Sequence, residues 1–513
     1  MPAGDDGRRA ATGLVDLRTL TALLVGGLVA GGVVLRFVTR SDLWLDEALS
    51  ANIARLPVGD LLDALSRDGH PPLYYLLLHG WMQVFGEGDV AVRALSGVIS
   101  VATLPVAWVA ARRYGGRVCA TAVLVLLATS PYALRYATEA RMYSLVMLLV
   151  LLGWLAVRWA FDDPRPVRLL AVAVVSGLLL LTHYWALYLL ASVAGLLVVR
   201  AIRRSGPGRA TTLRVLAAIA AGGVFFLPWL PTFFDQLGGT GTPWGAPSRP
   251  AEVVTEGLIE IGGGQYGEAR ALGAVLAVLA LLAVFGRALD SRHVELDLRT
   301  RPRARPEAAV LAATVVFGTG ISWVAGTAFA SRYLSVVFPL LVLLAGLGVT
   351  TIGSRPARTV VLAVVAALGV VGGGYNVITN RTQGGEIAAA VNAQAAPGDV
   401  VAVCPDQLGP STTRYLRDDL RAVSFPDLAD ARFVDWTDYA DRQRSGDPVA
   451  FAQQLVDRAG DGTVWLAWAG GYRGLERTCE AVVGQLSAMR APQEVVADDE
   501  SFEHGWLFRY AAP

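Results

Sequence analysis

Long apolar segments that recur along most of the chain constrain its fold more than any other feature. A stretch of about 20 apolar residues is long enough to cross the hydrocarbon core of a bilayer as an α-helix. Hydrophobic residues make up 54% of the chain and charged residues only 17%, which is far too apolar for a soluble protein of 513 residues. We therefore predict a polytopic α-helical membrane protein. About eleven segments fit this criterion: 17–37, 95–111, 118–130, 143–160, 168–182, 185–199, 213–229, 271–285, 308–327, 334–352 and 359–374.

Arginine is concentrated in every second segment that connects these spans. Connecting segments rich in positive charge face the cytoplasm in most membrane proteins. This alternation predicts a multi-pass protein of the cell membrane with a cytoplasmic N-terminus. The loop after the first span and the C-terminal region are then extracytoplasmic. The clusters are Arg112, Arg113 and Arg117, then Arg165 and Arg168, then Arg203, Arg204 and Arg209, then the arginines of 287–305, and finally Arg355 and Arg358.

The first outer loop, residues 39–93, is unusually long. Residues 71–81 within it are apolar and aromatic but too few to span a bilayer, so we predict a helix that lies in the membrane interface and starts at a proline. We predict an earlier short helix at residues 57–65. Together the two helices are expected to surround the segment that follows the first span.

The pattern changes near residue 383, where apolar spans give way to alternating short strands and helices. Strands are predicted at 399–404, 421–425, 463–468 and 506–510, and helices at 411–417, 448–459 and 475–489. This predicts a membrane domain, residues 1–382, followed by a small extracytoplasmic α/β domain, residues 383–513. Cys404 and Cys479 both fall in this domain and are available to pair in an oxidising compartment, although the sequence leaves their pairing open.

Two adjacent carboxylates, Asp46 and Glu47, follow directly after the first predicted span. A carboxylate there meets both lipid headgroups and water, so a base at Asp46 can act on substrates whose tails lie in the bilayer. The competing interpretation is structural, because acidic residues in the first turn of a helix complement its dipole. This pair alone leaves both interpretations open.

Further ionisable residues lie at span ends on the same predicted side, and their convergence predicts a polar cavity. Glu139 is a candidate second acid, and Arg135, Arg141 and Arg332 are candidate phosphate ligands. The sequence contains no Lys, so any phosphate ligand of fixed positive charge must be Arg. The structural alternatives are an ion pair within one loop for Glu139 and, for Arg332, a side chain that reaches toward the membrane surface.

Two histidines, His70 and His183, lie at the same predicted face. Imidazole and carboxylate groups are common metal ligands, so Asp46, Glu139 and His70 form a candidate site for a divalent metal. Histidines beside prolines and aromatic residues more often pack or cap helices, which is the alternative interpretation. Beyond this divalent metal, the sequence indicates no cofactor.

Three motifs follow one another in the membrane part of the chain: Leu43-Trp44-Leu45-Asp46-Glu47, then His70-Pro71-Pro72-Leu73-Tyr74-Tyr75, then Glu139-Ala140-Arg141-Met142-Tyr143. As an ordered set they resemble the GT-C superfamily of integral membrane glycosyltransferases, in particular its branch of protein mannosyltransferases and aminoarabinose transferases. The resemblance extends over residues 17–374 and leaves out the C-terminal α/β domain.

The resemblance implies that Asp46 is a catalytic base, with Glu47 beside it, and that the sugar donor is carried on a polyprenyl phosphate. One base that deprotonates the acceptor as it attacks the anomeric carbon fits a single displacement with inversion. The departing phosphate would be stabilised by guanidinium groups. Related proteins place a Lys near the donor phosphate, and in this chain we expect Arg135, Arg141 or Arg332 to take that role.

The resemblance also points to further pocket residues, with Tyr143 and Tyr333 beside the donor phosphate and His70, Tyr74 and His183 in the substrate pocket. The predicted function is transfer of a sugar, mannose or arabinose, to a cell-envelope glycan, lipid or protein on the outer face of the membrane. The alternatives are a transporter or flippase of lipid-linked sugars and a noncatalytic membrane scaffold. Ionisable residues crowded at one face, without repeated halves, disfavour a transporter. A net charge of +1 without a dense basic face excludes nucleic acid as a partner.

Overall fold

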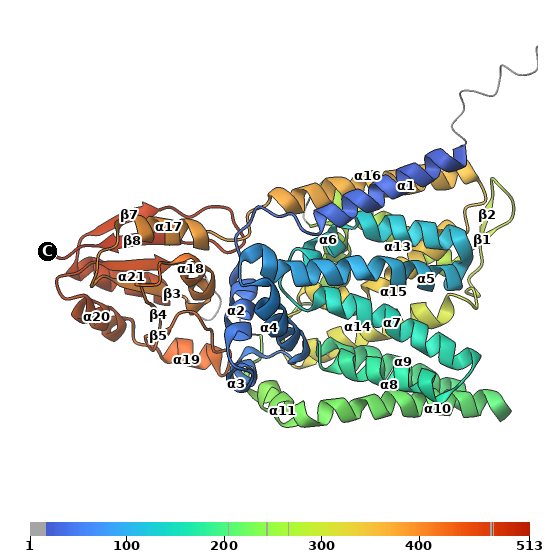
Figure 1. Ribbon diagram of the computed structural model, residues 1–513, viewed down its shortest axis with the longest axis horizontal. Helices are drawn as coiled ribbons and strands as arrows, with labels where there is room; N and C mark the ends of the chain where they lie inside the picture. Colours follow the sequence, from blue (N-terminus) through green and yellow to red (C-terminus); the bar gives the residue numbers. More distant parts are fainter. Residues whose placement is uncertain (1–16, 204, 243–244, 265, 472–474, 476) are drawn as a thin grey trace, which may run out of the picture.

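The molecule is divided along its length into a bundle of helices and a smaller domain built on a β-sheet. Its computed structural model describes residues 17–203, 205–242, 245–264, 266–471, 475 and 477–513. Figure 1 shows the bundle in blue to yellow at one end and the sheet domain in orange to red at the other, with the C-terminus at its tip. The N-terminus, predicted to be cytoplasmic, and Arg204 lie outside the described residues.

The bundle consists of apolar helices. Among the described residues, seven helical segments are long and apolar enough to cross a membrane, and three shorter apolar helices accompany them. The predicted polytopic α-helical membrane fold is thus confirmed, whereas the number of spans stays a prediction. The bundle helices are α1 (Leu17–Leu35), α5 (Asp89–Thr129), α7 (Tyr143–Asp162), α8 (Pro166–Leu180), α9 (Trp185–Ile202), α10 (Gly206–Gly222), α13 (Gly267–Phe285), α14 (Arg305–Val324), α15 (Phe338–Val349) and α16 (Arg355–Ile378).

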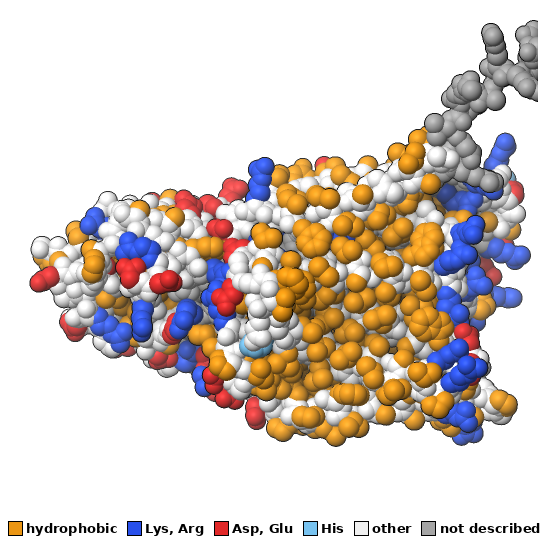
Figure 2. Space-filling model, viewed as in Figure 1, with side chains coloured by type: hydrophobic (Ala, Val, Ile, Leu, Met, Phe, Trp, Pro, Cys, Tyr) orange, Lys and Arg blue, Asp and Glu red, His pale blue; other side chains and the backbone are white. Residues whose placement is uncertain are grey.

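Hydrophobic side chains cover the outside of the bundle. On the face shown in Figure 2 they form a broad belt with few charges, and basic side chains gather at the end of the bundle far from the sheet domain. A hydrocarbon environment accommodates such a belt, and the charged end marks where the helices leave it. Which side of the membrane this end faces stays a prediction.

A glycine divides helix α5 into two spans. Gly116 has φ +79°, outside the helical region, a conformation that costs glycine little because it has no Cβ. Arg36 donates from Nε to Ser100 Oγ (3.0 Å) and from Nη2 to the carbonyl of Leu127 (2.7 Å), so the two halves of α5 lie side by side. The segments predicted separately at 95–111 and 118–130 therefore form a helical hairpin.

Three short helices lie between the bundle and the sheet domain: α2 (Leu45–Arg55), α3 (Val58–Asp68) and α4 (Leu73–Phe85) (Figure 1). Helices α3 and α4 occupy the regions predicted at 57–65 and 71–81. Each follows a proline directly. Proline is well tolerated at the start of a helix, because a backbone N–H there would have no acceptor within the helix. Asp46 and Glu47 occupy the first turn of α2.

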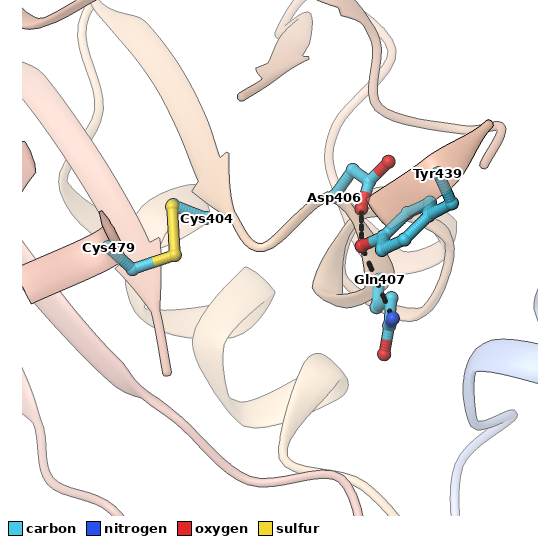
Figure 3. Close-up of a disulfide and its surroundings, with 5 residues drawn as sticks. All are labelled: Cys404, Asp406, Gln407, Tyr439 and Cys479. Carbon is cyan, nitrogen blue, oxygen red and sulfur yellow. Dashed lines mark hydrogen bonds between the residues drawn. A yellow bond between two sulfur atoms is a disulfide. The ribbon is translucent and has the colours of Figure 1, made fainter. Parts of the chain in front are cut away.

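The C-terminal domain is built on a six-stranded mixed sheet of order β5-β4-β3-β6-β8-β7. Strand β3 is parallel to β4 and β6, whereas β8 is antiparallel to β6 and β7. A disulfide joins Cys404, at the end of β3, to Cys479 in α21 (Figure 3). The elements are α17 (Gly384–Gln394), β3 (Val400–Cys404), α18 (Gly409–Tyr415), β4 (Ala422–Ser424), β5 (Ala429–Asp430), α19 (Tyr439–Ser445), α20 (Pro448–Ala459), β6 (Val464–Trp468), α21 (Thr478–Met489), β7 (Pro492–Val496) and β8 (Trp506–Tyr510).

Several elements were not expected from the sequence. Strands β5 and β7 and helices α17 and α19 add to the four predicted strands and three predicted helices of this domain. The segments that connect the spans also contain regular structure: α6 (Pro131–Ala137), α11 (Leu230–Gly239), α12 (Pro250–Gly262), the 3-10 helix η2 (Ser331–Val336), and a hairpin of β1 (Gly286–Ala288) and β2 (Val294–Leu296).

Polar contacts attach the sheet domain to the short helices. Arg414 and Tyr415 of α18 both bind Asp89, the first residue of α5, through contacts of 2.9 and 2.6 Å. The Tyr415 hydroxyl also accepts the backbone N–H of Leu43 (2.7 Å), and Asn52 donates to the carbonyl of Arg432 (2.9 Å). The sheet domain is therefore fixed directly over the segment that carries the two adjacent carboxylates.

Candidate active site

A cavity of about 460 Å³ lies where the bundle, the short helices and the sheet domain meet. We call its two sides the bundle wall, which contains Asp46, Asp68, His70, Arg141 and Arg332, and the sheet wall, which contains Gln407, Trp436, Phe502, Glu503 and His504. Charged groups dominate the bundle wall, whereas the sheet wall combines aromatic and hydrogen-bonding side chains. The remaining lining residues are Trp44, Leu45, Gly69, Thr240, Gly241, Thr242, Tyr333, Gly470 and Gly471.

Asp46 presents its carboxylate to this cavity between two arginines. Its Oδ2 is 3.2 Å from Nη1 of Arg332 and 3.9 Å from Nη2 of Arg141. Arg332 comes from η2 and Arg141 from the segment between α6 and α7, so residues from three distant parts of the chain converge. The structure thus brings together the predicted base and two of the three predicted phosphate ligands, while their chemical roles stay predictions.

The helix that carries Asp46 is capped by the sheet domain. The N-cap residue of α2, Trp44, makes no side-chain capping bond. Instead, Oε2 of Glu503 accepts the N–H of Leu45 (2.9 Å), and its Oε1 accepts the hydroxyl of Ser411 (2.6 Å). Burial, together with the nearby charge of Asp46, raises the pKa of Glu503 to about 7 against these hydrogen bonds. The helix that positions the candidate base is therefore capped by a residue 458 positions from Leu45 in the sequence.

Arg141 is held in place by a buried network. Its Nη1 donates to Tyr75 (2.9 Å) and to Ser50 (3.0 Å), and its Nη2 lies 3.0 Å from His70 Nε2. His70 Nδ1 and the Tyr75 hydroxyl both reach Asp68 Oδ2, at 3.0 and 2.6 Å. Because Arg141 can only donate, His70 accepts at Nε2 and donates from Nδ1 to Asp68. Burial raises the pKa of Asp68, but the interactions with His70 and Arg141 outweigh burial and lower this pKa to about 2.

Glu47 does not line the cavity, which corrects its assignment as a catalytic residue. Its two carboxylate oxygens accept Nε and Nη2 of Arg93 at 2.7 and 2.6 Å, and Oε1 also accepts the N–H of Ala140 (3.0 Å). Burial raises the pKa of Glu47, but the positive charges of Arg93 and Arg381 lower it by more than burial raises it. The pKa of Glu47 is therefore lower than usual. Glu47 therefore joins α2 to α5 and to the third motif.

Glu139 and Arg135 also lie apart from the cavity. Glu139 is fully buried, with Oε2 at 3.3 Å from Nε of Arg135, and burial raises its pKa despite Arg135 and Arg381. An ion pair within one loop was the structural alternative given for Glu139, here with Arg135 as its partner. Neither side chain lines the cavity, so we do not retain Glu139 as a second acid or Arg135 as a phosphate ligand.

Aromatic rings support the bundle wall from behind. Of the predicted aromatic and histidine residues, His70 and Tyr333 line the cavity. The His183 ring lies between Tyr143 and Tyr333, with ring centroids 5.9 and 5.5 Å apart, and Tyr74 is buried with its hydroxyl 2.8 Å from Ser96 Oγ. Burial lowers the pKa of His183, so this ring is neutral and packs. The geometry therefore corrects Tyr74, Tyr143 and His183 from pocket residues to supporting ones.

The candidate metal ligands are not assembled. Asp46 and His70 line the cavity, but Glu139 does not. In the part of the chain that the structure describes, no three His, Cys, Asp or Glu side chains form a group suited to a metal ion. The set of Asp46, Glu139 and His70 is therefore not a site as predicted.

The sheet wall was not predicted from the sequence. Gln407 donates from Nε2 to the Tyr439 hydroxyl (3.2 Å), which donates to Asp406 Oδ1 (2.5 Å) (Figure 3). Burial raises the pKa of Asp406 to about 7. Phe502 packs edge to face against Trp44 with ring centroids 5.5 Å apart, which brings the two walls together. The residues of this wall follow strands and loops and show no motif that marks them beforehand.

The arrangement places the Asp46 carboxylate beside two guanidinium groups at the end of an apolar bundle, with Asp68 and Glu503 as further carboxyl groups of the lining. A carboxylate in this position can accept a proton from a hydroxyl, and the guanidinium groups can bind a phosphate through charge-assisted hydrogen bonds. Both groups lie at the boundary between the hydrophobic belt and the sheet domain. A substrate with a lipid tail and a phosphorylated head would reach them from the bilayer.

Comparison with known proteins relates a segment of the chain to one family. The family described as Dolichyl-phosphate-mannose-protein mannosyltransferase matches residues 69–231. No match was found among the curated protein sequences.

Two solved structures share the fold over nearly their whole length. ArnT from Cupriavidus metallidurans in the apo state has a TM-score of 0.60 at 16% identity, covering 96% of this chain and 98% of ArnT. ArnT bound to undecaprenyl phosphate has a TM-score of 0.58 at 14% identity with the same coverage. The resemblance to GT-C membrane glycosyltransferases of the protein-mannosyltransferase and aminoarabinose-transferase branch is thereby confirmed.

Proposed function

We propose that this protein is an inverting glycosyltransferase that moves a sugar from a polyprenyl-phosphate donor to an acceptor in the cell envelope. The observation that carries this proposal is the Asp46 carboxylate, which faces the cavity 3.2 Å from Arg332. The ArnT fold supports it further, because ArnT was solved with undecaprenyl phosphate bound. The reaction takes place at the outer face of the plasma membrane, with mannose or arabinose as the expected sugars.

In this proposal Asp46 is the base. It takes the proton of the acceptor hydroxyl as the oxygen attacks the anomeric carbon, while the bond from that carbon to the phosphate oxygen breaks. A carboxylate that is paired with Arg332 is a poor base. Donor phosphate competes for the same guanidinium donors, so its binding leaves Asp46 available to the acceptor hydroxyl.

Arg332 and Arg141 bind the donor phosphate. Negative charge that develops on the bridging oxygen is stabilised by guanidinium groups already oriented toward it, and the preorganised network of Tyr75, His70 and Asp68 holds Arg141 ready. The leaving group is stable as an anion. The two other described carboxyl groups that line the cavity already have partners, since Asp68 pairs with His70 and Glu503 caps Leu45. Asp46 as the single base therefore favours direct displacement. Inversion at the anomeric carbon follows.

The sheet wall holds the acceptor. Its aromatic and hydrogen-bonding groups line the same cavity as Asp46, where a polar envelope glycan, lipid headgroup or protein chain can bind beside the base. A transporter or flippase needs ionisable groups along a path through the bilayer midplane. The charged groups of this cavity instead gather at one end of the bundle.

The test is a transfer assay with the purified full-length protein. Polyprenyl-phosphate mannose and polyprenyl-phosphate arabinose are supplied separately with envelope lipid extracts, and the products are analysed by mass spectrometry. We expect a mass gain of one sugar with one donor. Asp46→Asn keeps the size of the side chain but removes the base, so turnover should fall by roughly 10²- to 10⁴-fold while donor binding persists.

Glu139→Gln is the matched control, because it neutralises a nearby carboxylate that lies outside the cavity. Equal turnover by Asp46→Asn and the unaltered protein would rule out Asp46 as the base. Absence of transfer by both proteins would point to a scaffold or flippase, and either outcome contradicts the proposal.

A further inference from the structure

One indole of the sheet wall, that of Trp436, is held in place at three points. Its backbone N–H donates to the carbonyl of Arg67 near the end of α3 (3.0 Å), and the N–H of Asp438 donates to the carbonyl of Gly239 at the end of α11 (2.9 Å). The ring of Tyr439 lies against the Trp436 ring, with centroids 5.0 Å apart and planes tilted by 34°. Trp436 lines the cavity, whereas Tyr439 does not. The cavity is therefore bordered by an aromatic ring whose position is fixed before a ligand binds.

Two hydrogen-bonding side chains line the same cavity. The Tyr439 hydroxyl gives its one proton to Asp406, so it accepts from Nε2 of Gln407. The amide oxygen of Gln407 is thereby turned away from the Tyr439 ring (Figure 3). His504 donates from Nδ1 to Asp498, because a carboxylate can only accept, and this leaves Nε2 for another partner. Gln407 and His504 thus offer a carbonyl oxygen and a ring nitrogen to a bound ligand.

The sheet wall lacks the fixed positive charge of the bundle wall. Both arginines among the described lining residues, Arg141 and Arg332, belong to the bundle wall, where they bind the donor phosphate in the proposed reaction. The chain contains no Lys. Glu503, the acidic member of the sheet wall, already caps Leu45. The described side chains of this wall therefore favour a neutral acceptor over a phosphorylated one.

The sheet also gives little support for a peptide acceptor. An extended peptide commonly binds by adding a strand to the edge of a sheet, where unpaired backbone groups are available. The edges of this sheet are β5 and β7, and neither contributes a described lining residue. A saccharide matches the wall better. One face of a sugar ring presents C–H groups that pack on an aromatic ring, and its hydroxyls need acceptors such as Gln407 and His504.

We infer that the sheet wall is a carbohydrate subsite, in which one sugar ring of a neutral glycan acceptor packs on Trp436 and its hydroxyls bind Gln407 and His504. This inference rests on the proposed function and narrows its acceptor to a glycan. A hydroxyl of the same glycan is then available to Asp46, which lines the same cavity. Trp436 holds the acceptor in the ground state and in the transition state alike, so it determines specificity through KM more than through kcat.

Saturation-transfer difference NMR of the full-length protein in phosphatidylcholine nanodiscs tests the inference. Nanodiscs replace detergent because the maltoside headgroups of common detergents would compete for a carbohydrate subsite. The probes are a mannose trisaccharide, an arabinose trisaccharide, a short peptide that contains Ser and Thr, and glycerol phosphate. We expect the ring protons of at least one trisaccharide to receive saturation, and we expect no saturation of the peptide or of glycerol phosphate.

Substitutions of Trp436 locate the subsite. Trp436→Ala should weaken trisaccharide binding about tenfold, because the sugar loses its aromatic packing partner, and Trp436→Phe should restore part of the binding. Trp159→Ala is the matched control, since Trp159 is an exposed tryptophan of α7 outside the cavity and its removal should leave binding unchanged. Size-exclusion profiles and unchanged binding of the donor lipid show that the variants are folded.

Transfer kinetics of the same variants separate acceptor binding from a structural role. Trp436→Ala should raise the KM for a glycan acceptor about tenfold and change kcat at saturating acceptor by less than about twofold. A general loss of structure would instead lower kcat. The KM for the polyprenyl-phosphate donor should stay the same, because the donor binds at the bundle wall.

Absence of saturation in both trisaccharides would overturn the inference, as would equal trisaccharide binding by Trp436→Ala and the unaltered protein. A protein that transfers sugar to a peptide or a lipid but not to a glycan refutes the subsite and leaves the proposed function intact. A protein that binds a trisaccharide through Trp436 but transfers no sugar supports the subsite and contradicts the proposed function.

Discussion

The two walls of the candidate active site differ in how they are built. The bundle wall takes its side chains from short motifs at span ends, and buried hydrogen bonds hold Arg141 and His70 through Tyr75 and Asp68. The sheet wall takes its side chains from loops of a domain that contacts the short helices through polar groups, among them the buried Glu503. The first wall therefore carries the charges that the proposed chemistry needs, and the second fixes the shape of the space around them.

The largest effect on turnover is expected from a substitution in the bundle wall. Arg332→Gln removes the guanidinium nearest Asp46 and should lower turnover roughly 10²- to 10³-fold, as loss of a preorganised charge-stabilising group does. Arg332→Lys should restore part of the activity. Arg135→Gln is the control, because its side chain pairs with Glu139 outside the cavity and should change turnover little. Equal losses in Arg332→Gln and Arg135→Gln would place the phosphate elsewhere.

A smaller effect is expected where the sheet wall meets α2. Glu503→Ala removes the cap from Leu45, which costs roughly 1 kcal/mol of helix stability, so turnover should fall about tenfold as the first turn of α2 frays. Glu503→Gln retains an acceptor oxygen and should restore most of the activity. Glu500→Ala changes an exposed acid of the same domain and should have no effect. Steady-state kinetics of the three variants decide the matter, and failure of Glu503→Gln to rescue would argue against a positioning role.

The smallest expected effect is a dependence of stability on pH. Burial raises the pKa of Glu503 from 4.5, and that of Asp406 from 3.8, to about 7 in the folded protein. Between these values the folded state binds more protons than the unfolded state, so stability is greatest at low pH and falls as pH rises toward 7. Thermal unfolding in detergent between pH 5 and about 8 should show this decline.

The double variant Glu503→Gln with Asp406→Asn should flatten that decline. A melting temperature that rises with pH in the unaltered protein would mean that other groups outweigh these two carboxyls.

Most of the charged residues of the bundle wall could be predicted from the sequence, because ionisable side chains stand out beside apolar spans. Asp46, His70, Arg141 and Arg332 are ionisable groups beside long apolar segments, and such groups are rarely kept without a function. The same argument wrongly placed Glu47 in the catalytic site beside Asp46. On a helix with 3.6 residues per turn, the next residue points about 100° away, and this rotation carries Glu47 from the cavity to Arg93.

The sheet wall could not be predicted for a different reason. The contact between Glu503 and Leu45 joins residues 458 positions apart, and no local pattern encodes it. Strand β7 was missed because it is largely exposed and starts at a proline, so it lacks the apolar alternation that marks a strand. Strands β3 and β6, whose residues are mostly buried, were found close to their true bounds.

The bond between Glu503 and the start of α2 also has a consequence for biosynthesis. Helix α2 is among the first parts of the chain to leave the ribosome, but the residue that completes its first turn is among the last. A nascent chain that stops before Glu503 can thus have every arginine of its bundle in place and still lack the cap of this helix. In the proposed enzyme, we expect such a truncated chain to turn over no faster than the Glu503→Ala variant.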